Sequence, residues 1–195
     1  LGEIDLQLKG RAASGAREAV YLALHYARRH GAVVFFDLDY RPYTWTSSEE
    51  TAIHYHLAAR QCDVLIGTRE EFDIMERLEH NPARDDAYTA QLWFQHQAKI
   101  VVIKHGQDGS VAYTKQGEVA RGTTFPAKVV KTFGAGDAYA AAFIYALMKG
   151  WELAKAMEYG AAAAAIVISS HSCSEAMPTA QQIDDYIRLC KSGQW

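Results

Sequence analysis

The protein has 195 residues, of which 49% are hydrophobic and 22% are charged, as in an ordinary soluble globular protein. This length suffices for one α/β domain with a sizeable core. The formal net charge of -3 gives no basic surface for nucleic acid or acidic membranes. The cysteines are few, odd in number and far apart, which indicates a reducing cytoplasm and not a disulfide scaffold. No apolar run is long enough to span a membrane, and the first residues do not resemble a signal peptide.

Helical and strand patterns alternate along the first half of the chain. Apolar residues at helical spacing predict a helix over residues 16–30 that ends at Gly31. A short apolar run predicts a buried strand over residues 32–36. Further helices are expected over residues 48–61, 70–78 and 85–96, and Ser47 or Ser48 would cap the first of them. Further strands are expected over residues 63–66 and 99–104.

The second half begins with an expected hairpin of residues 110–114 and 118–120 around a Lys-Gln-Gly turn. Helices are expected over residues 135–149, 152–168 and 179–190. Alternating strands and helices predict an α/β fold in which a mostly parallel sheet carries helices on both faces. No linker, repeat or charge block divides the sequence, so we expect a single domain over residues 1–195.

Residues 131–137, Lys-Thr-Phe-Gly-Ala-Gly-Asp, join the β-rich region to an alanine-rich helix. A helix N-terminus gathers unpaired N–H groups and the positive end of the helix dipole, so it suits an anion. Asp137 would repel a bound phosphate unless it takes a proton from a hydroxyl that attacks the phosphoryl group. The alternative is that Asp137 only caps the helix, because aspartate is a preferred N-cap residue.

Polar residues also follow the first predicted strand, at the end where open α/β sheets place ligands. Asp37, Asp39 and Arg41 alternate, so they project to one side if the chain stays extended. Arg41 could then clamp a carboxylate or phosphate oxygen. An internal salt bridge that ends the strand is an equally good interpretation.

Two further segments follow predicted strands. Glu71, three residues after Thr68, could hold hydrated Mg²⁺ near a phosphate, although Thr68 and the acids after it are also a common helix start. Lys104, Gly106 and Gly109 have the character of a phosphate-binding backbone loop, although this segment is also a turn into a hairpin.

The polar loop of residues 169–173 follows a predicted helix. His171 and Cys173 are poorly spaced for a nucleophile pair and lack a third partner. We therefore expect this loop to line a pocket or to cap a helix end.

The order and spacing of these motifs resemble the C-terminal half of the PfkB (ribokinase-like) carbohydrate kinases. The resemblance covers residues 17–187, and residues 35–45, 66–72 and 166–173 resemble a kinase of myo-inositol breakdown that acts on a sugar acid. It implies a three-layer α/β/α sandwich that lacks the family's N-terminal part and β lid.

The resemblance also implies the catalytic roles. Asp137 would be the base, and Gly134, Ala135 and Gly136 would form the anion hole around the transferred phosphoryl group. Glu71 would hold Mg²⁺, in a motif whose usual asparagine is replaced by threonine.

Ligand contacts follow from the same resemblance, with ATP and Mg²⁺ as cofactors and a monovalent cation such as K⁺ as a further one. Asp39 stands where the family has asparagine, and Lys131 replaces a common aspartate that the cation ligands would need. The implied nucleotide contacts are Lys104, Gly106, Gly109, Thr132, Phe133 and Ser170, and the implied substrate contacts are Asp37, Asp39 and Arg41.

Because the family is about twice this length, we expect a complementing N-terminal segment or self-association into a homo-oligomer. The alternative function is a catalytically silent nucleotide-binding or interaction protein. An oxidoreductase would need G-x-G-x-x-G after the first strand, and a Walker-type NTPase would need G-x-x-x-x-G-K-[ST]; the sequence has neither.

Overall fold

The computed structural model describes residues 14–79 and 85–194. Residues 1–13, 80–84 and 195 of the predicted single domain lie outside the described part. The chain divides into two compact units: unit 1 comprises Leu1–His105 and Tyr113–Val119, and unit 2 comprises Gly106–Ala112 and Ala120–Trp195. The single domain stays a prediction.

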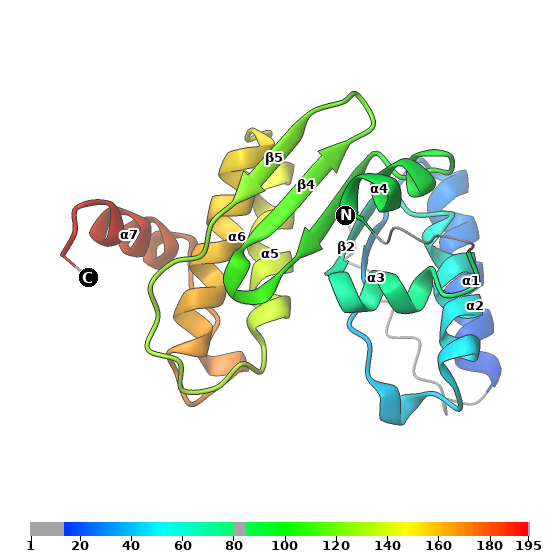
Figure 1. The fold of residues 1–195 in the computed structure, drawn as a ribbon, viewed down its shortest axis with the longest axis horizontal. Helices are drawn as coiled ribbons and strands as arrows, with labels where there is room; N and C mark the ends of the chain where they lie inside the picture. Colours follow the sequence, from blue (N-terminus) through cyan, green and yellow to red (C-terminus); the bar gives the residue numbers. More distant parts are fainter. Residues whose placement is uncertain (1–13, 80–84, 195) are drawn as a thin grey trace. The chain divides into compact units, whose positions relative to one another are not determined.

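Helices and strands alternate in unit 1 as the sequence predicts (Figure 1). Gly31, with φ of 67°, follows the first helix and turns the chain toward the first strand. The elements are α1 (Ser14–Arg29), β1 (Phe35–Asp37), the 3₁₀ turn η1 (Pro42–Thr44), α2 (Ser48–Ala59), β2 (Val64–Thr68), α3 (Arg69–Met75), α4 (Asp86–Phe94) and β3 (Ile100–Lys104).

The strands follow one another in the sheet in chain order, from β1 to β4 (Ser110–Thr114) and β5 (Val119–Gly122). β1 pairs with β2 and β2 with β3, both parallel, so that Asp37 lies opposite Ile66 and Thr68 opposite Lys104. The hairpin of β4 and β5 closes where the Thr114 N–H donates to the Glu118 carbonyl oxygen at 2.9 Å. The parallel pairing brings the carboxyl ends of β1, β2 and β3 to one edge.

The core of unit 1 is built from side chains of these strands and of the helices packed on them. Gly67 in β2 permits this packing, because a Cβ atom there would lie 2.5 Å from Leu38 Cδ1. Fully buried large side chains include Trp93, Phe36, Phe72, Leu24, Leu38, Leu65 and Met75.

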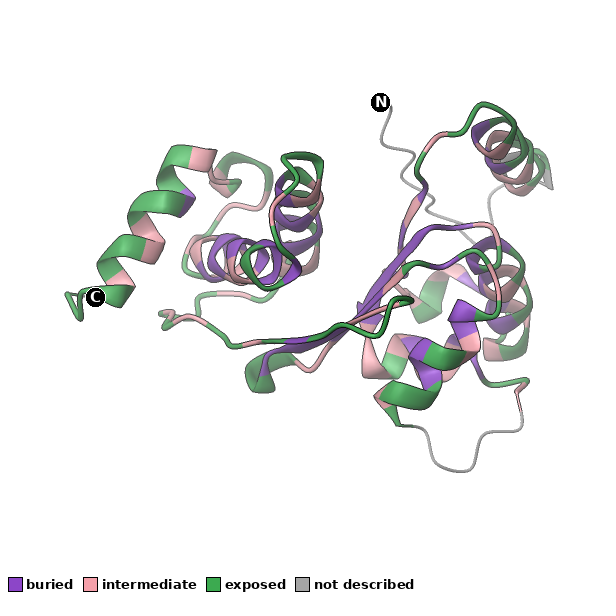
Figure 2. Ribbon diagram, turned by 90° about the horizontal axis from the view of Figure 1, so that it is seen from above, coloured by how far each residue is buried: buried purple, intermediate pink, exposed green. Residues whose placement is uncertain are grey.

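Unit 2 is dominated by α5 (Ala135–Met148) and α6 (Leu153–Ile168), which lie side by side (Figure 1). Gly160 permits their close approach, because a Cβ atom there would lie 3.0 Å from the Tyr139 carbonyl oxygen. The Tyr139 hydroxyl is 3.0 Å from the Ser110 hydroxyl at the start of β4. The helix α7 (Ala180–Lys191) is mostly exposed, with Ile183 as its buried residue (Figure 2). Two 3₁₀ turns, η2 (Gly106–Asp108) and η3 (Ser174–Ala176), complete unit 2.

The predicted elements agree with the structure to within a few residues. The first strand was expected over residues 32–36 and lies at Phe35–Asp37, because the pairing with β2 begins only at Phe35. The helix expected over residues 70–78 is α3, Arg69–Met75. Asp63, expected as the first residue of the second strand, precedes β2, which continues to Thr68.

Among the described helices, none combines the length and the apolar character that crossing a membrane requires.

Candidate active site

The N-terminus of α5 is open to a ligand. Its N-cap residue, Gly134, has a left-handed backbone with φ of 83° and has no side chain with which to cap the helix. The Ala138 N–H makes the first helical bond, to the Gly134 carbonyl oxygen at 3.0 Å, and the Ala135 N–H reaches the Thr132 carbonyl oxygen at 3.4 Å. This end therefore offers backbone N–H groups and the positive pole of the helix dipole.

Asp137 lies in the first turn of α5 with an exposed side chain. The N-cap position belongs to Gly134, so the interpretation of Asp137 as a helix cap is wrong. Within residues 14–79 and 85–194, no side chain forms an ion pair or hydrogen bond with the Asp137 carboxylate. An exposed acid beside free helix amides can accept a proton from a bound hydroxyl.

The loop before α5 is fastened to the end of α6. The N–H groups of Val130 and Lys131 donate to the Ile168 carbonyl oxygen at 2.8 and 3.3 Å. Lys131 Nζ lies 2.6 Å from the Sγ atom of Cys173, and that thiol donates to the Phe133 carbonyl oxygen at 3.6 Å. The loop of residues 169–173 thus supports the α5 N-terminus.

The other predicted residues near the α5 N-terminus are either exposed or part of the turn that ends α6. The Phe133 side chain is 67% exposed, and Thr132 is also exposed. The Ser170 N–H donates to the Val167 carbonyl oxygen at 3.1 Å, so Ser170 belongs to the turn that ends α6. His171 is exposed, and no described hydrogen bond joins it to Cys173.

At the carboxyl ends of the parallel strands, Lys104 Nζ lies 3.2 Å from Asp37 Oδ1. Burial raises the pKa of Asp37 to about 6; the Lys104 ammonium opposes this shift, and the Glu71 and Asp39 carboxylates add to it. The side chain of Asp37 is 25% exposed. This carboxyl group therefore changes charge near neutral pH.

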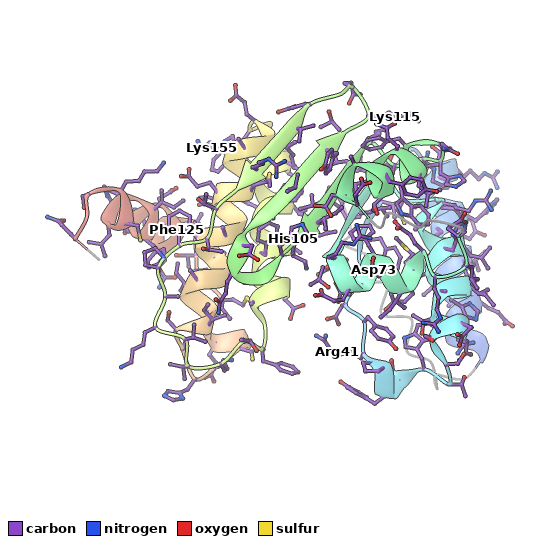
Figure 3. The ribbon with its side chains drawn as sticks, in the orientation of Figure 1. Arg41, Asp73, His105, Lys115, Phe125 and Lys155 are labelled. Carbon is purple, nitrogen blue, oxygen red and sulfur yellow. The ribbon has the colours of Figure 1, made fainter. Side chains whose placement is uncertain are left out.

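Asp39 and Arg41 form an ion pair with each other. The expected alternation of Asp37, Asp39 and Arg41 fails, because Asp39 has a left-handed backbone with φ of 36° and the chain is no longer extended there. Arg41 lies in the segment between β1 and η1 (Figure 3). The internal salt bridge is thus present, and the ligand contacts of these residues stay a prediction.

Glu71 fixes the segments that follow β1 and β2. Its Oε1 atom accepts the Tyr40 N–H at 2.9 Å, and its Oε2 atom accepts the Thr68 N–H at 2.7 Å. The Thr68 hydroxyl in turn accepts the Glu71 N–H at 3.2 Å, which completes a capping box at the start of α3. The predicted helix start is therefore confirmed.

These residues fit a hydrated magnesium ion. No cluster of three metal-ligating side chains occurs among the described residues. Mg²⁺ binds through one or two carboxylates, several waters and substrate phosphates, so such a cluster is not required. A carboxylate has about four acceptor positions, and Glu71 uses two for backbone N–H groups, which leaves room for water ligands of an ion.

The glycines predicted to lie along a nucleotide both have left-handed backbones. Gly106 has φ of 59° and begins η2, and Gly109 has φ of 89°. A Cβ atom at Gly109 would lie 2.1 Å from the Gly122 carbonyl oxygen. Gly109 is therefore required by its own turn, whether or not a nucleotide binds there.

Sequence reasoning missed a network centred on Arg69. Its guanidinium lies 3.1 Å from Asp73, 3.4 Å from Glu76 and 3.3 Å from Asp86. Asp86 also contacts His105 Nε2 at 2.7 Å, directly after β3. Only the spacing of Arg69 and Asp73 by four residues was visible in the sequence.

The predicted residues divide between the two units. Unit 1 holds a set of side chains at the ends of β1, β2 and β3, namely Asp37, Asp39, Arg41, Glu71 and Lys104. Unit 2 holds the glycine loop and the start of α5, with Gly106, Gly109, Thr132, Phe133, Gly134, Ala135, Gly136, Asp137 and Ser170.

Solved structures share this fold. A ribokinase II from E. coli in complex with ATP and Mg²⁺ has a TM-score of 0.78 at 20% identity, over 90% of this chain and 55% of that one. A double mutant of fructokinase from Vibrio cholerae O395, with fructose, ADP and a potassium ion bound, has a TM-score of 0.79 at 19% identity, over 90% of this chain and 57% of that one. The predicted ribokinase-like α/β fold is confirmed.

Sequence comparison gives the family. The pattern of the pfkB family carbohydrate kinases matches residues 5–180. A 5-dehydro-2-deoxygluconokinase of Geobacillus thermodenitrificans (strain NG80-2) is 69% identical over 183 residues, which are 94% of this chain and 54% of the relative. The chain thus spans about half the length of this relative, and it belongs to the pfkB family of carbohydrate kinases.

Proposed function

We propose that the protein carrying this chain transfers the γ-phosphoryl group of ATP to the terminal hydroxyl of a sugar acid, 5-dehydro-2-deoxygluconate. The substrate is inferred from the name of the relative that is 69% identical to this chain over 183 residues. The reaction type comes from the family and from the site at the start of α5.

The observation that carries the proposal is Asp137, an exposed acid in the first turn of a helix that no side chain caps within the described residues. In the proposed reaction, the Asp137 carboxylate accepts the hydroxyl proton while that oxygen attacks the γ-phosphorus atom, and ADP leaves as the bond from this phosphorus to the β–γ bridging oxygen breaks. The N–H groups of Gly134 and Gly136 stabilise the charge that develops on the phosphoryl oxygens.

Unit 1 carries charged side chains that suit a nucleotide and its metal ion. Lys104 would neutralise phosphate oxygens, and Glu71 would hold hydrated Mg²⁺, which would supply positive charge beside the phosphates. Support for Mg²⁺ is the pair of acceptor positions that Glu71 keeps beyond its two backbone contacts. Asp37, Asp39 and Arg41 would border the path of the substrate.

The proposal includes a monovalent cation beside the loop of residues 169–173. Its support is the potassium ion in the Vibrio cholerae fructokinase structure. Turnover that rises when K⁺ replaces tetramethylammonium at constant ionic strength is the expected result. Equal turnover in the two salts would remove the cation from the proposal.

The alternative is a nucleotide-binding protein without catalysis. ADP release should be measured with ATP and Mg²⁺, with and without 5-dehydro-2-deoxygluconate, and ATP binding should be measured by calorimetry. Release that depends on the sugar acid is expected for the kinase. ATP binding without such release would favour the silent protein. If the protein showed no ATP binding and no ADP release, both functions would be contradicted.

We also propose that a further segment of the protein, or a second copy of it, covers part of unit 1. Exposed apolar side chains on α1, α2 and the segment before β1 favour a covering segment or a second copy; they are Leu22, Tyr26, Val33, Ile53 and Leu57. A concentration-independent monomer in light scattering of this chain alone would contradict self-association. A cytoplasmic location stays a prediction.

A further inference from the structure

We propose that Lys131 is a positioning residue for phosphoryl transfer: through the Cys173 thiol, it holds the peptide that turns a backbone N–H of the anion hole toward the phosphoryl group. The inference rests on the function proposed above. Lys131 does not touch the reacting atoms, and it acts through two contacts, from its ammonium to Sγ and from Sγ to the backbone.

The first contact places a positive charge against the thiol. Lys131 Nζ lies 2.6 Å from Cys173 Sγ, and among the described residues no carboxylate pairs with this ammonium. The Lys131 side chain is held at both ends, because its backbone N–H donates to the Ile168 carbonyl oxygen at 3.3 Å. An ammonium that donates to sulfur polarises the thiol and strengthens the S–H group as a donor.

The second contact fixes the peptide between Phe133 and Gly134. The Cys173 thiol donates to the Phe133 carbonyl oxygen at 3.6 Å. In a trans peptide the C=O and N–H groups point in opposite directions. Because the Phe133 carbonyl points to the thiol, the Gly134 N–H points away from it, on the side opposite the support.

This peptide lies beside the end of α6 and Cys173. Gly134 has φ of 83°, and a Cβ atom there would lie 3.4 Å from Val167 Cγ1 and 3.6 Å from Cys173 Sγ. The end of α6 and the Cys173 thiol thus lie against the N-terminus of α5. Loss of the Lys131 ammonium would weaken the contact of the Cys173 thiol with the Phe133 carbonyl and misalign the Gly134 N–H. The remaining nucleotide contacts would persist.

The test compares Lys131→Met, Lys131→Arg, Cys173→Ala and the Lys131→Met/Cys173→Ala double variant in the protein that carries this chain. Lys131→Met should lower kcat roughly tenfold or more while KM for ATP changes less than about twofold, as expected when an interaction acts mainly in the transition state. Lys131→Arg, which keeps the charge and the donor, should restore most of kcat. The double variant should be no slower than the slower single variant, because both residues act along one path.

Lys128→Met is the matched control, because Lys128 is an exposed lysine of the same segment that contacts none of these groups among the described residues. It should leave kcat unchanged. Hydrogen exchange of the peptide covering residues 133–137 gives a readout independent of activity, and it should become faster in Lys131→Met but not in Lys128→Met.

Unchanged kcat and unchanged exchange in Lys131→Met would overturn the inference, as would additive losses in the double variant. A wild-type protein that shows no transfer to the sugar acid would contradict the proposed function instead, and the exchange comparison would then decide the positioning role alone. If Lys131→Met fails to fold, Lys131→Arg and Cys173→Ala still decide it: wild-type exchange and kcat in Cys173→Ala would overturn the inference.

Discussion

The Asp37 carboxyl group is the residue of the site whose charge is most directly coupled to stability. Burial raises its pKa from 3.8 to about 6, so the folded protein binds its proton more tightly than the unfolded chain does. The folded state is therefore favoured by this group below its unfolded pKa. That contribution is lost as the pH rises from about 4 to about 6.

Replacement Asp37→Asn should remove this pH dependence. The free energy of unfolding of Asp37→Asn minus that of wild type should be about 1–3 kcal/mol larger at pH 8 than at pH 4, because only the wild type loses stability over this range. Urea denaturation at both pH values measures the difference, and Asp185→Asn, an exposed acid on α7, is the control. A difference that is the same at both pH values would contradict the raised pKa.

Two glycines with left-handed backbones allow two destabilising effects of an alanine substitution to be measured separately: the strain of the backbone and the steric clash of the added Cβ atom. At Gly117, with φ of 96°, a Cβ atom would meet nothing within 4 Å, whereas at Gly109 it would lie 2.1 Å from the Gly122 carbonyl oxygen. Gly117→Ala should cost about 1–2 kcal/mol for the backbone alone. Gly109→Ala should cost a further 1–3 kcal/mol or so for overpacking. Equal costs in thermal denaturation would show that the turn at Gly109 relaxes freely.

Among the elements, α3 and α7 each begin with a capping box, at Thr68 and at Thr179 respectively. Only the box at Thr68 orients a carboxylate that is proposed to hold Mg²⁺.

Thr68→Ala and Thr179→Ala should therefore each cost about 1 kcal/mol of stability, since each removes one N-cap. Only Thr68→Ala should also raise the Mg²⁺ concentration needed for half-maximal turnover, because Glu71 loses part of the contact that orients it. Stability comes from urea denaturation and the Mg²⁺ requirement from initial rates. Equal Mg²⁺ requirements in the two variants would count against Glu71 as the magnesium residue.

The sequence predicts the elements well because their signals are local. The helical period of α1, the Ser47 cap of α2 and the apolar run of β3 each lie within a single element. The start of β1 depends instead on its register with β2, and no local pattern encodes that register. The left-handed backbone of Asp39 likewise undoes an alternation that only an extended chain would keep.

At the scale of the whole molecule, the candidate site was predicted as an order of motifs and not as a set of contacts. Residue types and spacing made Asp137 and Glu71 candidates, since a helix start and its acids are adjacent in sequence. The partners of Lys104 and Lys131, namely Asp37 and Cys173, are far away along the chain. Such pairs follow from folding and have no signature in one sequence.

The central claim is that Asp137 acts as the base and not as a structural residue. The measurement is kcat and ATP affinity of Asp137→Asn in the protein that carries this chain, beside Glu175→Gln, an exposed acid in η3. The account predicts a fall in kcat of several orders of magnitude with nearly unchanged ATP affinity and stability, and no effect of Glu175→Gln. Near-normal turnover in Asp137→Asn would contradict it.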